Sequence, residues 1–120
     1  MAITSNTLQP KFDDLVKQSS CTKSPDNNLL DGSGTVYNIR LVNQANMTYF
    51  KLYDTFSPTY GTTSPDFQVA VSADTTMTVQ CRQGITFSTA CSAAAARAGG
   101  TGATDDTNPG GLAYTLFGGE

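Results

Sequence analysis

The sequence is poor in the side chains on which most catalytic sites depend. It contains no histidine, its only glutamate is Glu120, and charged residues make up 14% of its 120 residues. Without histidine the usual general base is missing, and a nucleophilic serine or cysteine lacks its common partner. Asp54, Asp66 and Asp74 fall near different predicted strand ends, and no spacing pairs them for glycoside cleavage. The sequence therefore predicts a protein that is not an enzyme.

Basic clusters and long apolar runs are also missing. The net charge is −3, and the seven Lys and Arg residues are scattered along the chain, which argues against phosphate-backbone binding. No apolar run approaches the ~20 residues that span a bilayer. The N-terminus has no basic segment followed by an apolar one, so we expect no signal peptide. These absences predict a protein that binds neither nucleic acid nor membrane and is made in a reducing compartment.

The cysteines do not form a recognisable metal site. Cys21, Cys81 and Cys91 are an odd number, with no CxxC spacing and no histidine to complete a zinc site. We interpret them as buried or partly buried free thiols. The run "GGTGATDD" lacks the Gly-Lys-Ser/Thr ending of a phosphate-binding loop. The sequence therefore predicts no cofactor and no metal.

Residues 1–34 differ in pattern from the rest of the chain. Phe12, Leu15 and Val16 are spaced i, i+3, i+4, which predicts a short amphipathic helix. A polar stretch rich in turn residues follows and ends in Gly-Ser-Gly. We expect an N-terminal arm over 1–34, for which two interpretations stand. It either packs on a neighbouring subunit or is a partly disordered terminus.

From Thr35 onward the apolar residues recur with period two, as in half-buried strands. Turn residues separate the alternating runs, and "RQG" at 82–84 is one such predicted turn. The predicted strands are 35–43, 48–56, 66–72, 76–81, 85–91 and 112–118. The segment 92–111 has little apolar bulk and is predicted to be a long loop, with one helical turn at most in "SAAAAR". The pattern predicts an all-β domain over 35–120, an antiparallel sandwich or barrel.

The best-patterned part of the chain is a long hairpin over 49–71. Phe50 and Leu52 lie on one face of its first strand, and Tyr49, Lys51 and Tyr53 on the other. The link between its strands contains Ser-Pro twice, and each proline stops strand pairing. Aromatic residues are favoured at interface centres, although a strand buried on both faces explains the same pattern. The interface candidates, with two residues of the arm, are Phe12, Leu15, Tyr49, Tyr53, Phe56 and Tyr60.

Residues 36–96 resemble small structural proteins of tailed bacteriophages in the order of their predicted strands and in short sequence motifs. The resemblance rests on "YFKLYD", the link "SPTYGTTSPDFQVAV", and a glycine before "ITFSTACS". It includes no catalytic signature and does not extend to the N-terminal arm or the Gly/Thr-rich loop. The resemblance implies a virion component built on an antiparallel β-sandwich of jelly-roll type.

Among virion components the sequence favours a capsid decoration, or cement, protein. Such a protein would be assembled in the host cytoplasm, bind the major capsid protein on the outer capsid surface and stabilise the head. We expect a homo-oligomer with closed symmetry and favour a trimer. The alternative is a tail- or fibre-associated module that binds saccharide on the host surface, with 92–111 as its candidate loop.

Overall fold

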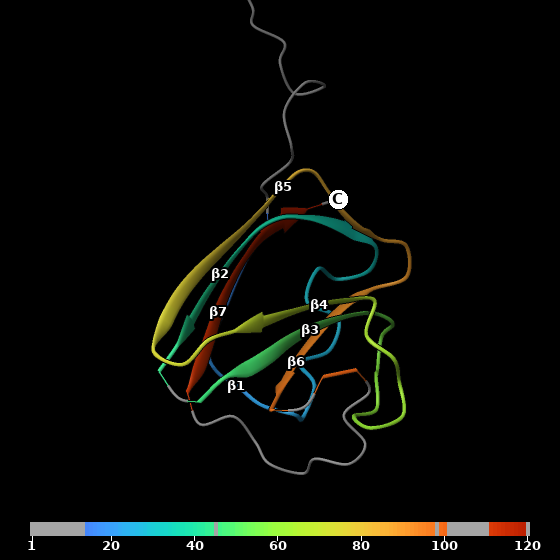
Figure 1. Ribbon diagram of the computed structural model, residues 1–120. Helices are drawn as coiled ribbons and strands as arrows, with labels where there is room; N and C mark the ends of the chain where they lie inside the picture. Colours follow the sequence, from blue (N-terminus) through green and yellow to red (C-terminus); the bar gives the residue numbers. More distant parts are fainter. Residues whose placement is uncertain (1–13, 45, 98, 101–110, 120) are drawn as a thin grey trace, which may run out of the picture.

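The computed structural model describes residues 14–44, 46–97, 99–100 and 111–119, which form two antiparallel sheets packed face to face (Figure 1). The strands are β1 (Asp14–Cys21), β2 (Gly34–Asn43), β3 (Thr48–Asp54), β4 (Phe67–Val71), β5 (Thr75–Phe87), β6 (Cys91–Ala96) and β7 (Leu112–Gly119). The large sheet has the order β1-β7-β2-β5 and the small sheet the order β4-β3-β6. The predicted all-β antiparallel sandwich is confirmed.

The segment 22–29 runs beside β6 as an irregular strand. Asp26 and Ala93 exchange two backbone hydrogen bonds of 2.8 and 3.0 Å, and the amide of Ala95 donates to the Thr22 carbonyl. If the strands are renumbered in chain order with this segment as the second of eight, the large sheet has the order 1-8-3-6. The small sheet then has four strands in the order 2-7-4-5. This is the arrangement of a jelly roll, in which two four-stranded sheets share the core.

The core lies between the two sheets and is filled by every second residue of the strands. Ile39 and Leu41 of β2 face Phe50 and Leu52 of β3, and none of these four side chains is exposed. The Phe50 and Tyr114 rings pack with their centroids 5.2 Å apart. Burial of such side chains contributes about 1.5–3 kcal/mol each to folding. The alternation read from the sequence thus has its cause in this shared interior.

The N-terminal prediction is wrong for the residues that the structure describes. Leu15 and Val16 lie in β1, where they pair with Phe117 and Leu116 of β7, and not in a helix. Phe12 lies outside the described residues. Pairing with β7 makes period two the better fit, because Leu15 is exposed and Val16 faces the core. The expected boundary at residue 34 also does not mark a break in packing, since β1 and segment 22–29 belong to the sandwich.

Residues 82–84, predicted to be a turn, instead form an irregularity within the continuous strand β5. Val36 of β2 pairs with Ile85, but Asn38 already pairs with Gln80, so 81–84 bulge out of the ladder. Gly84 has a φ of 82°, and a Cβ there would lie 2.2 Å from Cγ2 of Thr35. Glycine is required at this bulge because an L side chain meets both strain and a clash.

The prediction of a loop beginning at residue 92 is also wrong at its start. Cys91–Ala96 form β6, and all six residues are buried. Small side chains suit this strand because the core contacts one of its faces and loops of the chain cover the other. The strand was not predicted because its residues are all small, and strands are predicted from large apolar residues at every second position.

Candidate functional site

The outer face of the small sheet is covered by the chain itself. Lys51 and Tyr53 of β3 point away from the core, yet neither side chain is exposed. The loop 55–66 lies over this face, and its Pro58 is buried as well. For Tyr53 the second interpretation of the hairpin therefore holds, since this strand is buried on both faces. We call this region the covered face.

Lys51 is held by a carbonyl and an aromatic ring. Its Nζ donates to the backbone oxygen of Gly100 at 2.8 Å and lies 5.4 Å from the centroid of the Tyr60 ring. Nζ of Lys23 lies 6.0 Å from the same centroid. Both distances are in the range in which an ammonium group is attracted to an aromatic face. The loop residue Tyr60 thus connects the covered face to segment 22–29.

The Tyr53 hydroxyl differs from the Lys51 ammonium group in its surroundings. Its hydroxyl is buried without a hydrogen-bond partner among the described residues. Burial raises the pKa of Tyr53 to about 12, and the neighbouring Tyr60 and Cys21 add to the shift. A buried donor without a partner destabilises the fold by about 1–3 kcal/mol. The hydroxyl is therefore a structural weakness of the covered face.

Two aspartates fix the backbone next to the covering loop 55–66, one at the segment 88–90 and one between the two ends of the loop. The carboxylate of Asp54 accepts hydrogen bonds from the amides of Ser88, Thr89 and Ala90 at 3.2, 2.8 and 3.2 Å, and from Oγ of Ser88. The hydrogen bond from the Thr89 amide, with smaller effects from those of Ala90 and Ser88, lowers the pKa of Asp54. The amide of Asp54 donates to Oδ2 of Asp66 at 2.7 Å. The Asp54 carboxylate thus fixes the backbone of 88–90, and the Asp66 carboxylate links the two ends of the loop 55–66.

The cysteines are free thiols, as predicted. Cys21 and Cys91 are buried and Cys81 is half-buried. Burial, with a smaller effect from Asp54, raises the pKa of Cys91 to about 12. Burial also raises the pKa of Cys21, with Asp26 adding to it. Neither buried thiol forms a reactive thiolate at neutral pH.

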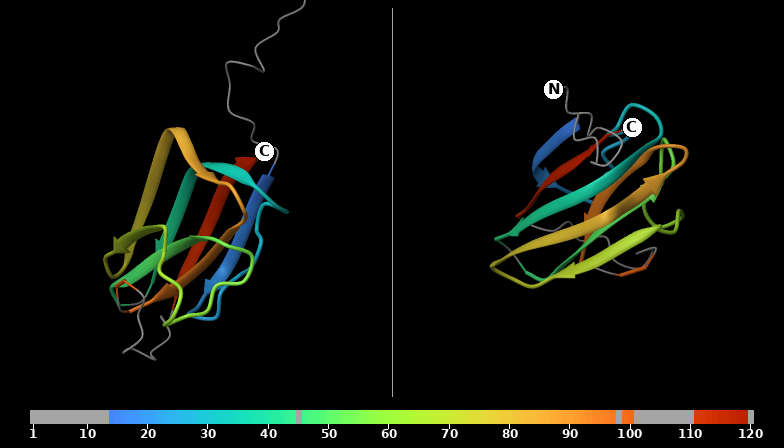
Figure 2. Two further views of the ribbon diagram at one scale, coloured as in Figure 1. Left: turned by 90° about the vertical axis from the view of Figure 1, so that its right-hand side faces the viewer. Right: turned by 90° about the horizontal axis from the view of Figure 1, so that it is seen from above.

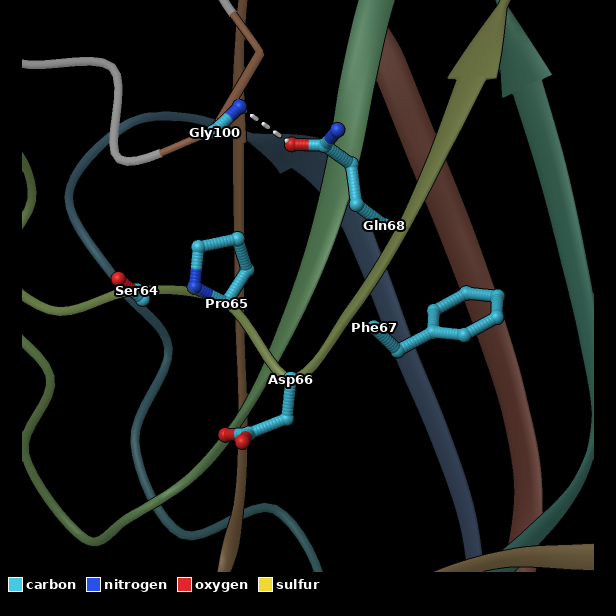
Figure 3. Close-up of a pocket in the computed structure, with 6 residues that line it drawn as sticks. All are labelled: Ser64, Pro65, Asp66, Phe67, Gln68 and Gly100. Atoms are coloured by element: carbon cyan, nitrogen blue, oxygen red, sulfur yellow. Dashed lines mark hydrogen bonds between the residues drawn. The ribbon is translucent and has the colours of Figure 1, made fainter.

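A shallow open depression of about 490 Å³ lies where β4 begins. It is lined by Ser64, Pro65, Asp66, Phe67, Gln68 and Gly100. The amide of Gly100 donates to Oε1 of Gln68 at 2.8 Å (Figure 3). Figure 3 shows the Phe67 ring turned toward the other sheet, so polar groups and Pro65 form the open surface. Gly100 belongs to the predicted saccharide loop 92–111, of which residues 98 and 101–110 lie outside the described part.

The outer face of the large sheet carries a different group of side chains. Leu15 of β1, 56% exposed, pairs directly with Phe117 of β7. In the next row of the same face, Thr115 separates Lys17 from Arg40, and both cations are exposed. We call Leu15, Lys17, Arg40 and Phe117 the outer-face patch. The structure therefore joins a predicted interface residue, Leu15, to three that the sequence analysis did not select.

The other interface candidates do not form one surface with Leu15. Phe56 is 50% exposed in the loop 55–66, whereas Tyr49 and Tyr60 are half-buried on the small sheet and its loop. Strand register was needed to find the outer-face patch, because Lys17, Arg40 and Phe117 are far apart in the sequence. A two-residue alternation assigns each of them to a face but does not say which strands are neighbours.

No family model, curated protein or solved structure matches the chain. Within the ranges that the structure describes, no helix is long and apolar enough to cross a membrane. The same ranges contain no cluster of three metal-ligating side chains.

Proposed function

We propose that the chain is a non-enzymatic structural protein of a tailed-phage virion that decorates the capsid. In this role it binds the major capsid protein on the outer surface of the head and stabilises the shell. The outer-face patch carries the proposal, because it places the exposed Leu15 against the half-buried Phe117 and has two exposed cations in the next row of the same face. The resemblance of residues 36–96 to phage structural proteins supports the same role. The jelly roll is compatible with it, since viral capsid domains use this architecture, although fold alone does not define function.

The composition of the patch fits a protein partner. Leu15 and Phe117 provide the apolar contact that interface centres favour, and Arg40 is of a residue type enriched there. The chain has a net charge of −3, so two exposed cations in one row of a sheet face, on either side of Thr115, are a local exception. We expect the capsid surface beneath them to be apolar and acidic.

The copy number in purified particles tests the role. Quantitative mass spectrometry against the major capsid protein is expected to give a ratio within a few-fold of the shell protein. A handful of copies per particle would place the protein in the tail, and its absence would refute a virion role.

Binding of the purified chain to particles that lack it tests the patch. Leu15→Asp is expected to weaken binding about tenfold or more, because it places an uncompensated charge in an apolar contact. Thr62→Asp changes an exposed loop residue and serves as the matched control. Equal binding by both variants would remove the patch from the contact.

The open depression favours a second candidate, a tail or fibre module that binds saccharide. Gln68 is oriented by Gly100, Asp66 keeps one carboxylate oxygen beyond its bond to Asp54, and Pro65 offers an apolar surface. Amide and carboxylate groups beside an apolar surface match the hydroxyls and C–H faces of a sugar ring. NMR titration with a panel of monosaccharides tests this candidate. Shifts confined to these residues, abolished by Gln68→Ala, would favour it over decoration.

A further inference from the structure

One side of the sandwich is open. β4 ends the order of the small sheet and β5 that of the large sheet, and the two strands lie on the same side of the molecule (Figure 1, Figure 2). Core-facing residues along this side are only half-buried, although they pack against the core. They are Phe67, Val69, Met77, Val79 and Ile85. We call the edges of β4 and β5 with these five side chains the open side.

Along the described part of the open side, the bulge of β5 at 81–84 is a feature that protects a sheet edge, but charged residues and prolines are missing from most of its length. No strand within the described residues pairs with the outer edge of β4 or β5. Neither Phe67–Val71 nor the stretch 75–81 contains a charge or a proline, the residues that usually block edge pairing. On the opposite side, β1 carries Lys17 and segment 22–29 covers β6. The open side is therefore the edge best suited to pairing with another strand.

Charges bound the uncharged stretch of β5 at both ends. Asp74 precedes it at the corner after β4, and Arg82 follows it at the bulge; both side chains are exposed. Between them, the pairing of β5 with β2 is regular from Thr75 to Gln80. Opposite charges at the two ends suit an antiparallel contact between two identical strands, because each end then meets its complement.

We propose that the open side binds a second copy of this chain, with β5 pairing antiparallel to β5 of that copy about a two-fold axis at Thr78. In this register Asp74 lies opposite Arg82 of the second copy. Met77 lies opposite Val79 of the second copy, so the half-buried apolar residues of both chains stay on one face. A shift by one residue would place core-facing residues opposite outward-facing ones, and a larger shift would separate the charges.

The pairing extends the large sheet across both copies and covers apolar side chains that one copy leaves half-exposed. It forms a closed, isologous contact, in which the same patch is used twice. The proposal gives a two-fold pair where the sequence analysis favoured a trimer. It does not depend on the virion role, because it concerns only contacts between copies of the chain.

Sedimentation velocity of the full chain over a range of concentrations tests the pairing. We expect a reversible dimer. Thr78→Lys places two like charges directly opposite each other at the axis, so the dimer is expected to weaken about tenfold and to recover partly at high salt. Ser19→Lys adds the same charge to the exposed part of β1 and is expected to leave the dimer unchanged.

Charge reversal at the ends tests the register. Arg82→Glu is expected to weaken the dimer by facing Asp74 of the second copy, and Asp74→Lys/Arg82→Glu is expected to restore it. Thermal melts of each variant at low concentration separate loss of pairing from loss of folding. A double variant that pairs no better than Arg82→Glu alone would overturn the register.

Hydrogen exchange gives a measurement that needs no variant. Amides within Thr75–Gln80 that do not bond to β2 are expected to exchange more slowly at concentrations at which the dimer forms. A chain that stays monomeric up to about 1 mM, where even a contact of about 4 kcal/mol would be seen, overturns the proposal. So does a trimer, or any oligomer that Thr78→Lys leaves intact.

Discussion

The two outward faces of the sandwich have similar alternating sequences but opposite environments. On the small sheet, Lys51 and Tyr53 point outward from β3 and are fully buried. On the large sheet, Lys17 and Arg40 point outward from β1 and β2 and are exposed. A lysine occurs on each face, so residue type does not decide which face is covered.

The lengths of the loops between strands decide which outward face is covered. The 55–66 link between β3 and β4 is long enough to fold back over the small sheet, and Asp54 and Asp66 hold its two ends together. In contrast, β4 and β5 are joined by the short corner 72–74. A long loop that returns over its own sheet uses the polar outer residues of that sheet as internal contacts. Among the described residues, the outward side chains of Lys17 and Arg40 on the large sheet therefore stay exposed.

Truncation of Lys51 should have the largest effect on this contrast. Lys51→Ala removes a buried four-carbon stem and the bond to Gly100, so we expect the free energy of unfolding to fall by about 2–3 kcal/mol. Arg40→Ala, the exposed counterpart, is expected to change it by less than about 0.5 kcal/mol. Urea denaturation of both variants measures the difference. Equal, small effects would show that the covering loop contributes no burial in solution.

The sequence was sufficient to predict the sandwich because its signals are local. The alternation in β2, β3, β4 and β7 directly reflects a two-layer core, and the hairpin 49–71 was predicted with both strands. Gly84 was predicted to lie in a turn between two strands. A glycine with positive φ occurs in bulges as well as in turns, and only the pairing of β5 with β2 shows that Gly84 lies in a bulge. The helix expected at Leu15 failed because tertiary pairing outweighs a weak local pattern.

The candidate site was less predictable because it depends on neighbours far apart in the sequence. Leu15 was selected for its apolar character, but its companions Phe117 and Arg40 join it only through the order β1-β7-β2. Tyr53 was selected as an interface residue and is buried, because nothing local indicates that 55–66 folds over it. The prediction of the site would have required the strand register and the path of the loop 55–66, and both are set by tertiary packing.

Removal of single hydroxyl groups should separate the covered face from the core. Tyr53→Phe deletes a buried hydroxyl that has no hydrogen-bond partner among the described residues, so we expect the free energy of unfolding to rise by about 1 kcal/mol. Tyr114→Phe, the matched change in the core, deletes a hydroxyl that donates to Oδ2 of Asp26 at 2.8 Å, and a fall of about 1–2 kcal/mol is expected. Thermal or urea unfolding gives both values. A fall for Tyr53→Phe as large as for Tyr114→Phe would mean that the Tyr53 hydroxyl has a partner in solution.

The smallest expected effect concerns the Asp54 carboxylate, which fixes the segment 88–90 between β5 and β6, and this effect depends on pH. Asp54→Asn replaces a carboxylate that accepts bonds from three amides, so at pH 7 we expect a loss of about 1 kcal/mol, since the group is partly exposed to water. Because folding lowers the pKa of Asp54, its stabilising effect is fully present above the unfolded value of about 3.9 and is lost as the pH falls through the folded value. The difference between wild type and variant should therefore be constant from pH 7 to about 5 and shrink below about 4. Asp31→Asn, at an exposed aspartate, is the control. A difference that persists unchanged at pH 2 would show that Asp54 acts through its shape and not through its charge.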